Sequence, residues 1–494
     1  MRFGPGIGLA ILAPLWLAGW TAELRGQTPA WPSTAGQAGH QRAPTEGLVV
    51  GRGTPTPAWP NTAWESAPEP VLAPNAAERL PPVEIRQETL EEAWAAALAV
   101  DQGLEAKQFS ASASQQAVQS AAAQRWPVVA VDGSYTVRSD QPAFLFSFPG
   151  IPLPTDVFPY AQQENFAFRG RVDYPLYTGG RIRSSIDAAA AQAASTNLNV
   201  AEARMELKLR VAEEYVLVLR AERALEVSEC NVRSLESHLH VVERLYEQEQ
   251  VPRNDLLAAQ VALSDARQEV MKARNSLDIS RATYNRRLGR PLADSVQLAA
   301  LTLETPQTDL ESLTSQALHQ RPVLASLAAQ AQSFERQAES VLAKNRPQVQ
   351  LRGEYAWEEN RYRTPEGIAA AGVGCTWNVF DGGQNRYGAA ALQHEAESAR
   401  RLQRDLESKI ALEVRRAWLE IQETRSRLEV TPEAIQQAEE NLRVARKRYA
   451  CGTGINTVVL DAESQRTQAY RNHYHATYDA VLAVLHLRYA AGEL

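Results

Sequence analysis

Apolar residues recur at seven-residue intervals through two long stretches of the chain. In the first stretch these positions are Val211, Val218, Leu225, Val232, Leu239 and Tyr246, with Leu235 and Val242 completing a three-four spacing. The residues 203 positions further on are Val414, Ile421, Leu428, Ile435, Leu442 and Tyr449, and the register continues without a gap. A sustained heptad predicts the seam of a coiled coil. We therefore expect two long helices, one over about 181–250 and one that begins near 384.

Both long helices end at a turn-forming tip and are followed by a return helix. The tips are Gln250-Val-Pro-Arg253 and Cys451-Gly-Thr-Gly454, and the return helices are predicted to reach about 288 and about 490. Each copy is therefore a helical hairpin. Inside the second long helix, Thr431-Pro432 places a proline after a capping residue, which predicts a restart or a kink there.

A glycine pair precedes each long helix. In Tyr174-Pro-Leu-Tyr-Thr-Gly-Gly-Arg181 and again in Trp377-Asn-Val-Phe-Asp-Gly-Gly-Gln384, aromatic residues lead into the pair. Alternating apolar and polar residues come before each pair, and the heptads come after it. We interpret these glycines as hinges where a strand becomes a helix; they are Gly179, Gly180, Gly382 and Gly383. The block 177–289 duplicates as 380–492, so the chain is a tandem structural repeat.

A shorter helix is predicted ahead of each strand region. It runs over about 90–124, with Thr89 as its N-cap and acidic residues in its first turn, and it ends before Trp126-Pro127. The same pattern returns 220 residues later, where Leu310-Glu311 matches Leu90-Glu91. We therefore place the first repeat at 85–289, a linker at 290–307 and the second repeat at 308–494.

Four segments alternate apolar and polar residues with a period of two, which predicts β-strands. They cover 129–138, 166–174, 349–358 and 371–379. A half-buried antiparallel sheet in a soluble domain would show the same alternation. The strongly charged face, the aromatic residues on the apolar face and strands of about ten residues favour the wall of a membrane barrel around water. Four strands cannot close a barrel around a lumen, so several subunits would have to pool theirs. The connection between the first two strands is interpreted as an external loop.

The N-terminal part of the chain carries the features of export and of a linker. Residues 1–22 contain one basic residue and an apolar run from Ile7 to Trp20, which is typical of a secretory signal and too short to span a bilayer. Residues 23–84 are rich in Pro, Gly, Thr and Ala and repeat the peptide Thr-Pro-Ala-Trp-Pro, which favours a flexible leader. No later apolar run reaches the length of a membrane helix.

Composition excludes some classes of partner and chemistry. A net charge of -7 and a pI near 5.8 leave no basic footprint for nucleic acid. The two histidine pairs are spaced two residues apart, which does not place both rings on one helix face, and no catalytic or phosphate-binding motif is present. We expect no enzyme activity, no metal and no cofactor. The three cysteines, Cys230, Cys375 and Cys451, show no metal spacing and leave at least one thiol unpaired within the chain.

The duplicated strand, glycine pair and hairpin resemble the outer-membrane efflux and secretion channel family, the TolC-like proteins. The resemblance runs from about Leu90 to the C-terminus and includes the tip segments Val251-Pro-Arg-Asn-Asp-Leu-Leu257 and Tyr449-Ala-Cys-Gly-Thr453. It implies a mainly α fold with a small β part: a homotrimer whose protomers each give four strands to one outer-membrane β-barrel, continued by a long α-helical coiled-coil tunnel across the periplasm.

The resemblance also implies a gate at the hairpin tips. Asp255 matches an aspartate that holds the first hairpin closed, Tyr449 its tyrosine partner on the second, and Asp461 an aspartate of the aperture. A carboxylate that accepts a phenol hydrogen bond can join two helices, and a ring of carboxylates favours cations. Three family positions differ in this chain, where the expected arginine, second aspartate and tip glycine are Gly454, Val458 and Glu249.

The resulting hypothesis is a passive export channel of a tripartite efflux or type I secretion system. The resemblance implies a periplasmic adaptor protein on the helical tips, an inner-membrane transporter as the energy source, and outer-membrane lipid around the strands. The alternative is a soluble periplasmic coiled-coil scaffold, which has no need of strands with a charged face. The exported substrate is not readable from the sequence: drugs, metals, peptides and whole proteins all remain open.

Overall fold

The computed structural model describes residues 87–146, 150, 157–301 and 309–494. The predicted signal and the predicted leader lie outside the described residues. Helices occupy most of the described chain, and the first repeat contains α1 (Leu90–Val100), α2 (Gln102–Ala123), α3 (Arg181–Glu247) and α4 (Arg253–Arg287). The second repeat contains α5 (Leu310–Gln320), α6 (Pro322–Leu342), the short 3-10 helix η1 (Ala343–Asn345), α7 (Gln384–Ala450) and α8 (Asn456–Ala491). The prediction of a mainly α fold with a small β part is confirmed.

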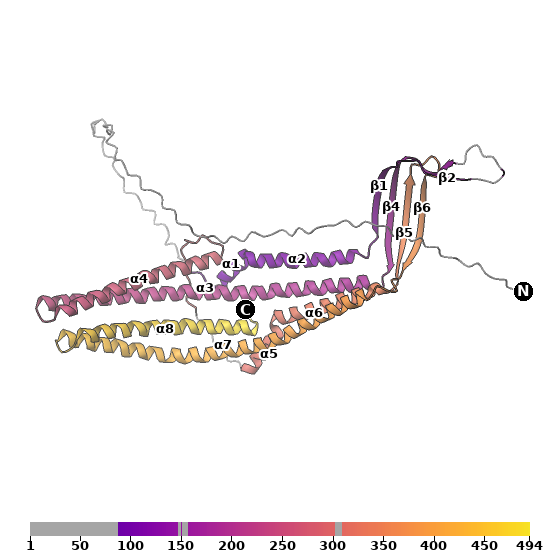
Figure 1. Cartoon of the computed structure of the whole chain (residues 1–494). Coiled ribbons are helices and arrows are strands. Elements are labelled where there is room, and N and C mark those ends of the chain that lie inside the picture. Colours follow the sequence, from indigo (N-terminus) through magenta and orange to yellow (C-terminus); the bar gives the residue numbers. More distant parts are fainter. Residues whose placement is uncertain (1–86, 147–149, 151–156, 302–308) are drawn as a thin grey trace, which may run out of the picture. The chain divides into compact units, whose positions relative to one another are not determined.

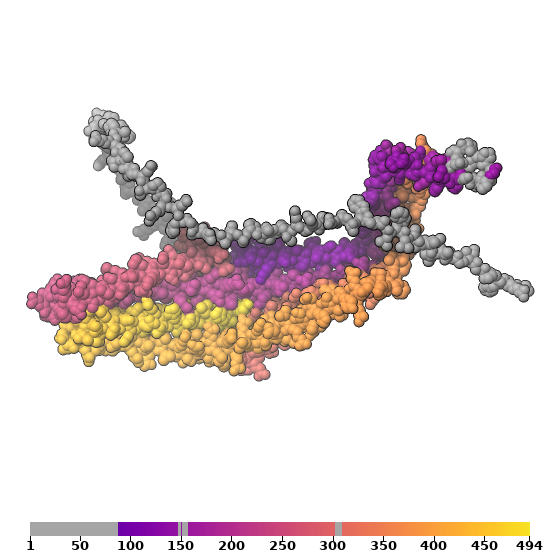
Figure 2. All heavy atoms as spheres, in the orientation of Figure 1, coloured from indigo at the N-terminus to yellow at the C-terminus, as the bar shows by residue number. Residues whose placement is uncertain are grey.

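The two long helices, α3 and α7, each contain 67 residues and begin directly after a glycine pair. At about 1.5 Å per residue each is roughly 100 Å long. Figure 1 shows α4 returning along α3 and α8 returning along α7, and Figure 2 shows the two hairpins in contact along their sides. Every position of the predicted seam is buried or half-buried except Tyr246, which is exposed at the end of α3.

Each leading helix is broken in two, whereas the sequence predicts one continuous helix over 90–124. The break in the first repeat falls at Asp101, whose backbone is extended (ψ 113°) and whose carboxylate accepts from the Leu104 amide at 2.7 Å as an N-cap. The break in the second repeat falls at Arg321, with ψ 115°. There Pro322 follows, and a proline pushes the residue before it out of the helical region.

The predicted interruption at Thr431-Pro432 does not occur, because α7 runs through Pro432 without a gap. Proline has no amide hydrogen, so the carbonyl of Leu428, one turn earlier, loses its usual donor. The Thr431 hydroxyl lies 3.3 Å from that carbonyl and supplies a substitute donor. The same hydroxyl lies 2.9 Å from Nδ1 of His473 on α8, so the return helix supports this point of α7.

Four strands form one antiparallel sheet in the order β1 (Val128–Val137), β4 (Glu164–Tyr177), β5 (Gln348–Glu358) and β6 (Gly367–Thr376). Three of the predicted strands are found within a few residues of their expected bounds. The fourth was predicted at 371–379 and lies earlier, because its neighbour β5 begins at Gln348, opposite Thr376, and offers no partner further on. The connection predicted as an external loop contains a hairpin of β2 (Ala143–Leu145) and β3 (Val157–Pro159).

The pairing register keeps the predicted alternation across all four strands. Val172 of β4 lies opposite Val129 and Gly353, whereas Arg171 lies opposite Ala130 and Glu354. Ion pairs join the charged face, such as Arg352 with Asp173 at 2.7 Å. One face of the sheet is therefore apolar and the other charged.

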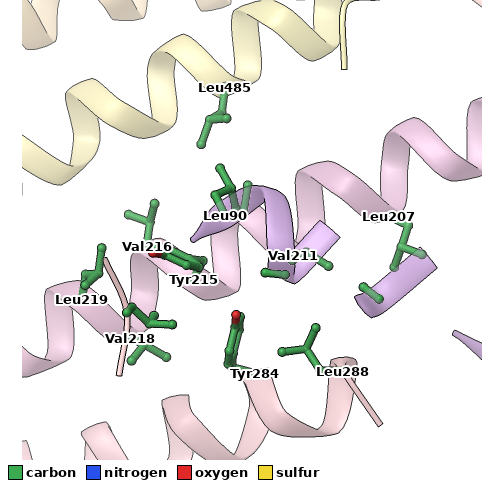
Figure 3. Close-up of a cluster of buried hydrophobic side chains, with 14 of the residues drawn as sticks. Leu90, Leu207, Val211, Tyr215, Val216, Val218, Leu219, Tyr284, Leu288 and Leu485 are labelled. Carbon is green, nitrogen blue, oxygen red and sulfur yellow. The ribbon is translucent and has the colours of Figure 1, made fainter. Parts of the chain in front are cut away.

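The main core lies where α1, α3, α4 and the segment after α4 meet. Figure 3 shows Tyr215 and Tyr284 among leucines and valines of these elements, with Leu485 of α8 reaching in from the second repeat. The Tyr215 hydroxyl donates to the carbonyls of Glu88 and Ala299, at 2.8 and 2.7 Å, and burial raises its pKa to about 12. The first described residues of the predicted linker are thus packed on the first repeat.

All three cysteines are free and exposed. Among the residues that the structure describes, none of the helices combines the length and the apolar character needed to cross a membrane.

Candidate functional site

The two hairpin tips have the same backbone geometry in spite of different sequences. In the second tip Gly452 has a φ of 72°, and its amide donates to the carbonyl of Tyr449. In the first tip Glu249 takes the equivalent position with a φ of 57°, and its amide donates to the carbonyl of Tyr246. The left-handed conformation is unusual for a residue with a Cβ. Glu249 therefore forms the same turn in the first tip that a glycine forms in the second.

Asp255 and Tyr449, predicted as gate partners, lie together at these tips. The phenol of Tyr449 on α7 donates to Oδ2 of Asp255 on α4 at 3.2 Å. Tyr449 is 3% exposed, and burial together with the nearby carboxylate raises its pKa, which keeps the phenol a donor. This hydrogen bond joins the second hairpin to the first.

A buried histidine and asparagine extend this contact to all four hairpin helices. Nδ2 of Asn456 on α8 donates to the backbone carbonyl of Asp255 at 2.9 Å, and its Oδ1 lies 2.8 Å from Nε2 of His238 on α3. The side-chain oxygen of Asn456 can only accept a hydrogen bond, so Nε2 of His238 is the donor and carries the proton. Burial lowers the pKa of His238, so its neutral form is favoured in the fold.

A buried carboxylate forms a second junction about two helical turns from the start of α8. Glu463 of α8 is 2% exposed and pairs with Arg446 of α7. Arg466 lies 3.2 Å from its Oε2, and the hydroxyl of Ser234 on α3 donates to it at 3.0 Å. Two guanidinium groups and a hydroxyl compensate the buried charge of the Glu463 carboxylate. If one of these partners were removed, the desolvation cost of the carboxylate would no longer be compensated and the fold would be destabilised. This junction also links the two hairpins.

Asp461, the predicted aperture residue, does not join either cluster. It lies on an exposed part of α8, and its side chain has no hydrogen bond or ion pair with any residue that the structure describes. At Gly454, where the resemblance implies an arginine, an added Cβ would lie 3.0 Å from the Tyr449 amide nitrogen and 3.2 Å from the Arg448 carbonyl carbon. The second tip is therefore too tight at this position for an unstrained side chain.

The predicted hinge glycines all have positive φ angles: 60° at Gly179, 92° at Gly180, 67° at Gly382 and 88° at Gly383. Gly180 and Gly383 are the residues from which α3 and α7 start. Residues 178–180 separate β4 from α3, whereas the longer segment 377–383 separates β6 from α7, and each glycine pair is the last part of its connection. A Cβ at Gly179 would lie 2.6 Å from the Cβ of Arg346, so close packing adds a second reason for glycine there.

Sequence reasoning missed the Glu463 junction and the His238–Asn456 contact. The repeat itself carried a signal, because Arg466 occupies the position of Leu263 in the first copy, and Leu263 is buried. When a charged residue stands where the other copy has a buried apolar residue, a partner that compensates the charge is expected. No cluster of three or more histidine, cysteine or acidic side chains suited to a metal ion occurs in the described part of the chain.

Known proteins share both the sequence pattern and the fold. The profile of the outer membrane efflux protein family matches residues 94–290 and 313–493. The alkaline protease secretion protein AprF of Pseudomonas aeruginosa is 24% identical over 333 residues, which cover 65% of this chain and 67% of AprF.

Solved structures extend the likeness to the fold. The outer membrane protein VceC of Vibrio cholerae superposes with a TM-score of 0.69 at 17% identity, covering 82% of this chain and 96% of VceC. The CmeC outer membrane channel of Campylobacter jejuni superposes with a TM-score of 0.70 at 14% identity, covering 82% of this chain and 85% of CmeC. The family and the fold are those of transport channels, and a soluble scaffold is not favoured. The chain belongs to the outer membrane efflux protein family, and its location is the outer membrane, with an extension into the periplasm.

Proposed function

We propose that this chain is the outer-membrane export channel of a tripartite efflux or type I secretion system, and that it opens at the hairpin tips. The observation that carries the proposal is the hydrogen bond from Tyr449 to Asp255, because it joins the two hairpins at the end furthest from the sheet. A hydrogen bond to a charged group contributes about 1.5 to 3 kcal/mol. Such a bond is strong enough to hold two helices together and weak enough for a partner to break.

The sheet supports assembly into a trimer. Its order leaves β1 and β6 as edges, each hydrogen-bonded to one neighbour. Unpaired edges are templates for pairing with another chain. Three copies joined from β1 to β6 would form one closed sheet whose charged face surrounds water and whose apolar face contacts lipid.

The channel has no energy source of its own in this proposal. A periplasmic adaptor protein docks on the tips and draws the hairpins apart, and an inner-membrane transporter drives the substrate. The similarity to AprF, which is named for protease secretion, supports the secretion system over drug efflux. In the trimer Asp461 would line the aperture, and Asp461→Asn would then lower the preference for cations.

The gate is tested by single-channel conductance in planar bilayers. Tyr449→Phe removes the donor and Asp255→Ala removes the acceptor of the hydrogen bond, and we expect the open state to become about tenfold more populated in each variant. Tyr246→Phe is the matched control, because Tyr246 has the equivalent repeat position and is exposed on α3. Unchanged conductance in both gate variants would refute the assignment of these residues.

The assembly is tested separately by light scattering, corrected for detergent, on protein extracted from outer membranes. The mass of three chains is the expected result. A monomer or a dimer would contradict the closed sheet and leave the gate without a channel to close.

A further inference from the structure

A histidine is buried among the helices of both hairpin tips. His238 of α3 is 4% exposed, and its ring centroid lies 5.5 Å from that of Tyr449. Its Nε2 lies 2.8 Å from Oδ1 of Asn456, and Nδ2 of Asn456 donates to the backbone carbonyl of Asp255 at 2.9 Å. The histidine therefore touches one member of the gate hydrogen bond directly and reaches the other through one asparagine.

The histidine also fixes how the Asn456 amide is oriented. Asn456 is 1% exposed, so both ends of its amide need partners inside the protein. The proton on Nε2 of His238 requires an oxygen opposite it, which turns the nitrogen of the amide toward α4. The link from the second hairpin to the Asp255 backbone thus depends on the neutral ring of His238.

The duplicated coiled coil does not itself require this pair. The residue 203 positions after His238 is Asn441, which is exposed on α7 and donates to Gln465 at 3.1 Å. The residue 203 positions before Asn456 is Arg253, which is exposed at the start of α4. The histidine and the asparagine therefore belong to the contact between the hairpins and are not a feature that both copies share.

The charged groups around the ring come from three helices and are already paired. The Asp255 carboxylate of α4 accepts from Tyr449, and Glu463 of α8 pairs with Arg446 of α7. Burial has the largest influence on His238 and lowers its pKa, and Arg446 acts in the same direction. The two carboxylates act in the opposite direction without outweighing burial.

A second proton on the ring would place a positive charge where the closed tips exclude water. A buried charge without a partner of its own is costly. When the hairpins move apart, water reaches the ring and solvates the charge, so the open tips bind the proton more tightly than the closed tips. A ligand that binds one state more tightly shifts the equilibrium toward that state.

We propose that His238 is a positioning residue of the gate and its pH switch: the neutral ring holds Asn456 against α4, and protonation of the ring releases the tips. The inference rests on the proposed channel function and adds acid as a signal for opening. The closed state has its full advantage above about pH 6.5, the ordinary pKa of histidine. It loses that advantage as the pH falls toward the lower pKa that His238 has in the closed tips, by up to about tenfold per pH unit for one proton per chain.

Two readouts test the switch on the purified full-length chain at about pH 8 and about pH 5, the range in which histidines titrate. Hydroxyl-radical footprinting measures the oxidation of Tyr449, which is 3% exposed, relative to Tyr387, which is 72% exposed near the other end of α7. We expect the relative oxidation of Tyr449 to rise about tenfold in acid. Single-channel conductance in planar bilayers should show a matching rise in the open population.

Two histidine variants identify the group that titrates. His238→Gln keeps a donor for Asn456 and has no charge at either pH, so the acid response of Tyr449 should disappear. His240→Gln is the matched control, because His240 lies on the same helix and its side chain is 70% exposed. Its acid response should equal that of the unmodified chain.

Tyr449 that stays protected at about pH 5 in the unmodified chain would overturn the switch, whether or not His238→Gln folds. An equal acid response in His238→Gln and in the unmodified chain would overturn it as well. The two readouts separate the switch from the channel. Exposure of Tyr449 in acid without a rise in conductance would uphold the switch and contradict the channel, whereas conductance that rises equally in His238→Gln would contradict the switch and leave the channel intact.

Discussion

The two repeats break their leading helices at equivalent residues and place opposite charges there. Asp101 and Arg321 have nearly the same backbone angles, with φ of -65° in both. Asp101 caps the next helix locally, whereas Arg321 reaches across to α3 and α7. The shared backbone follows from the duplicated sequence, but the side chain decides whether the break is a local turn or a junction between helices.

The tips show a second difference between the repeats. Tyr246 and Tyr449 occupy the same seam position, yet the first is 38% exposed and the second 3% exposed. Tyr449 is covered because Asp255 and the His238 ring lie against it. Duplication thus produced two equivalent tyrosines, of which one contacts the other hairpin.

The largest expected effect distinguishes the two helix breaks. Arg321→Ala would leave the Glu202 carboxylate without its buried partner and should cost about 3 kcal/mol of stability. Asp101→Ala removes a helix cap and should cost about 1 kcal/mol. Thermal unfolding followed by far-ultraviolet circular dichroism measures both. Equal losses would show that Arg321 is no more than a local turn residue.

The next effect distinguishes the two glycine hinges. Gly179→Ala and Gly382→Ala both force a Cβ into the left-handed region, which costs about 1 kcal/mol. At Gly179 the new Cβ also meets the Arg346 Cβ at 2.6 Å, whereas nothing lies within 4 Å at Gly382. We expect the Gly179 variant to lose about 2 kcal/mol or more in the same unfolding assay. A larger loss at Gly382 would contradict the packing argument.

The smallest effect is a pH dependence that differs between two histidines. The Glu213 carboxylate, with Glu420 nearby, raises the pKa of His486, whereas burial lowers the pKa of His238. The contribution of His486 to the stability of the fold is therefore fully present below about pH 6.5. It is lost as the pH rises through the pKa that His486 has in the folded state. His238 has the opposite sign, because protonation below about pH 6.5 favours the unfolded chain.

Unfolding of His486→Gln and His238→Gln across this pH range tests the pair. Removing His486 should abolish the loss of stability on the alkaline side, and removing His238 should abolish the loss on the acidic side. The effect of His486 should stay below about 1 kcal/mol, since its side chain is a third exposed and its ion pairs are screened by solvent. Parallel pH profiles for the two variants would show that neither histidine acts as described.

Much of the fold could be predicted because its signals are local and periodic. The heptads ending at Tyr246 and Tyr449 defined two long helices, and the alternation around Tyr174 and Tyr355 defined strands. The breaks at Asp101 and Arg321 were missed because each interrupts an otherwise regular helical pattern for one residue. The continuous helix at Pro432 was missed because the Thr431 hydroxyl compensates for the missing amide, and composition does not reveal that.

The sequence by itself determined the strand-to-helix glycines and the tip turns, because each depends on residues close together in the chain. It also determined the tandem repeat and the family resemblance, because these local patterns recur along the chain in the same order. It also pointed to Asp255 and Tyr449, through the resemblance. Only the tertiary structure decided which helix faces meet, and so brought Glu463 to Arg446 and Ser234, and Arg321 to Glu202. Those contacts depend on how each helix is rotated against its neighbours, and the packing of the whole core sets that rotation.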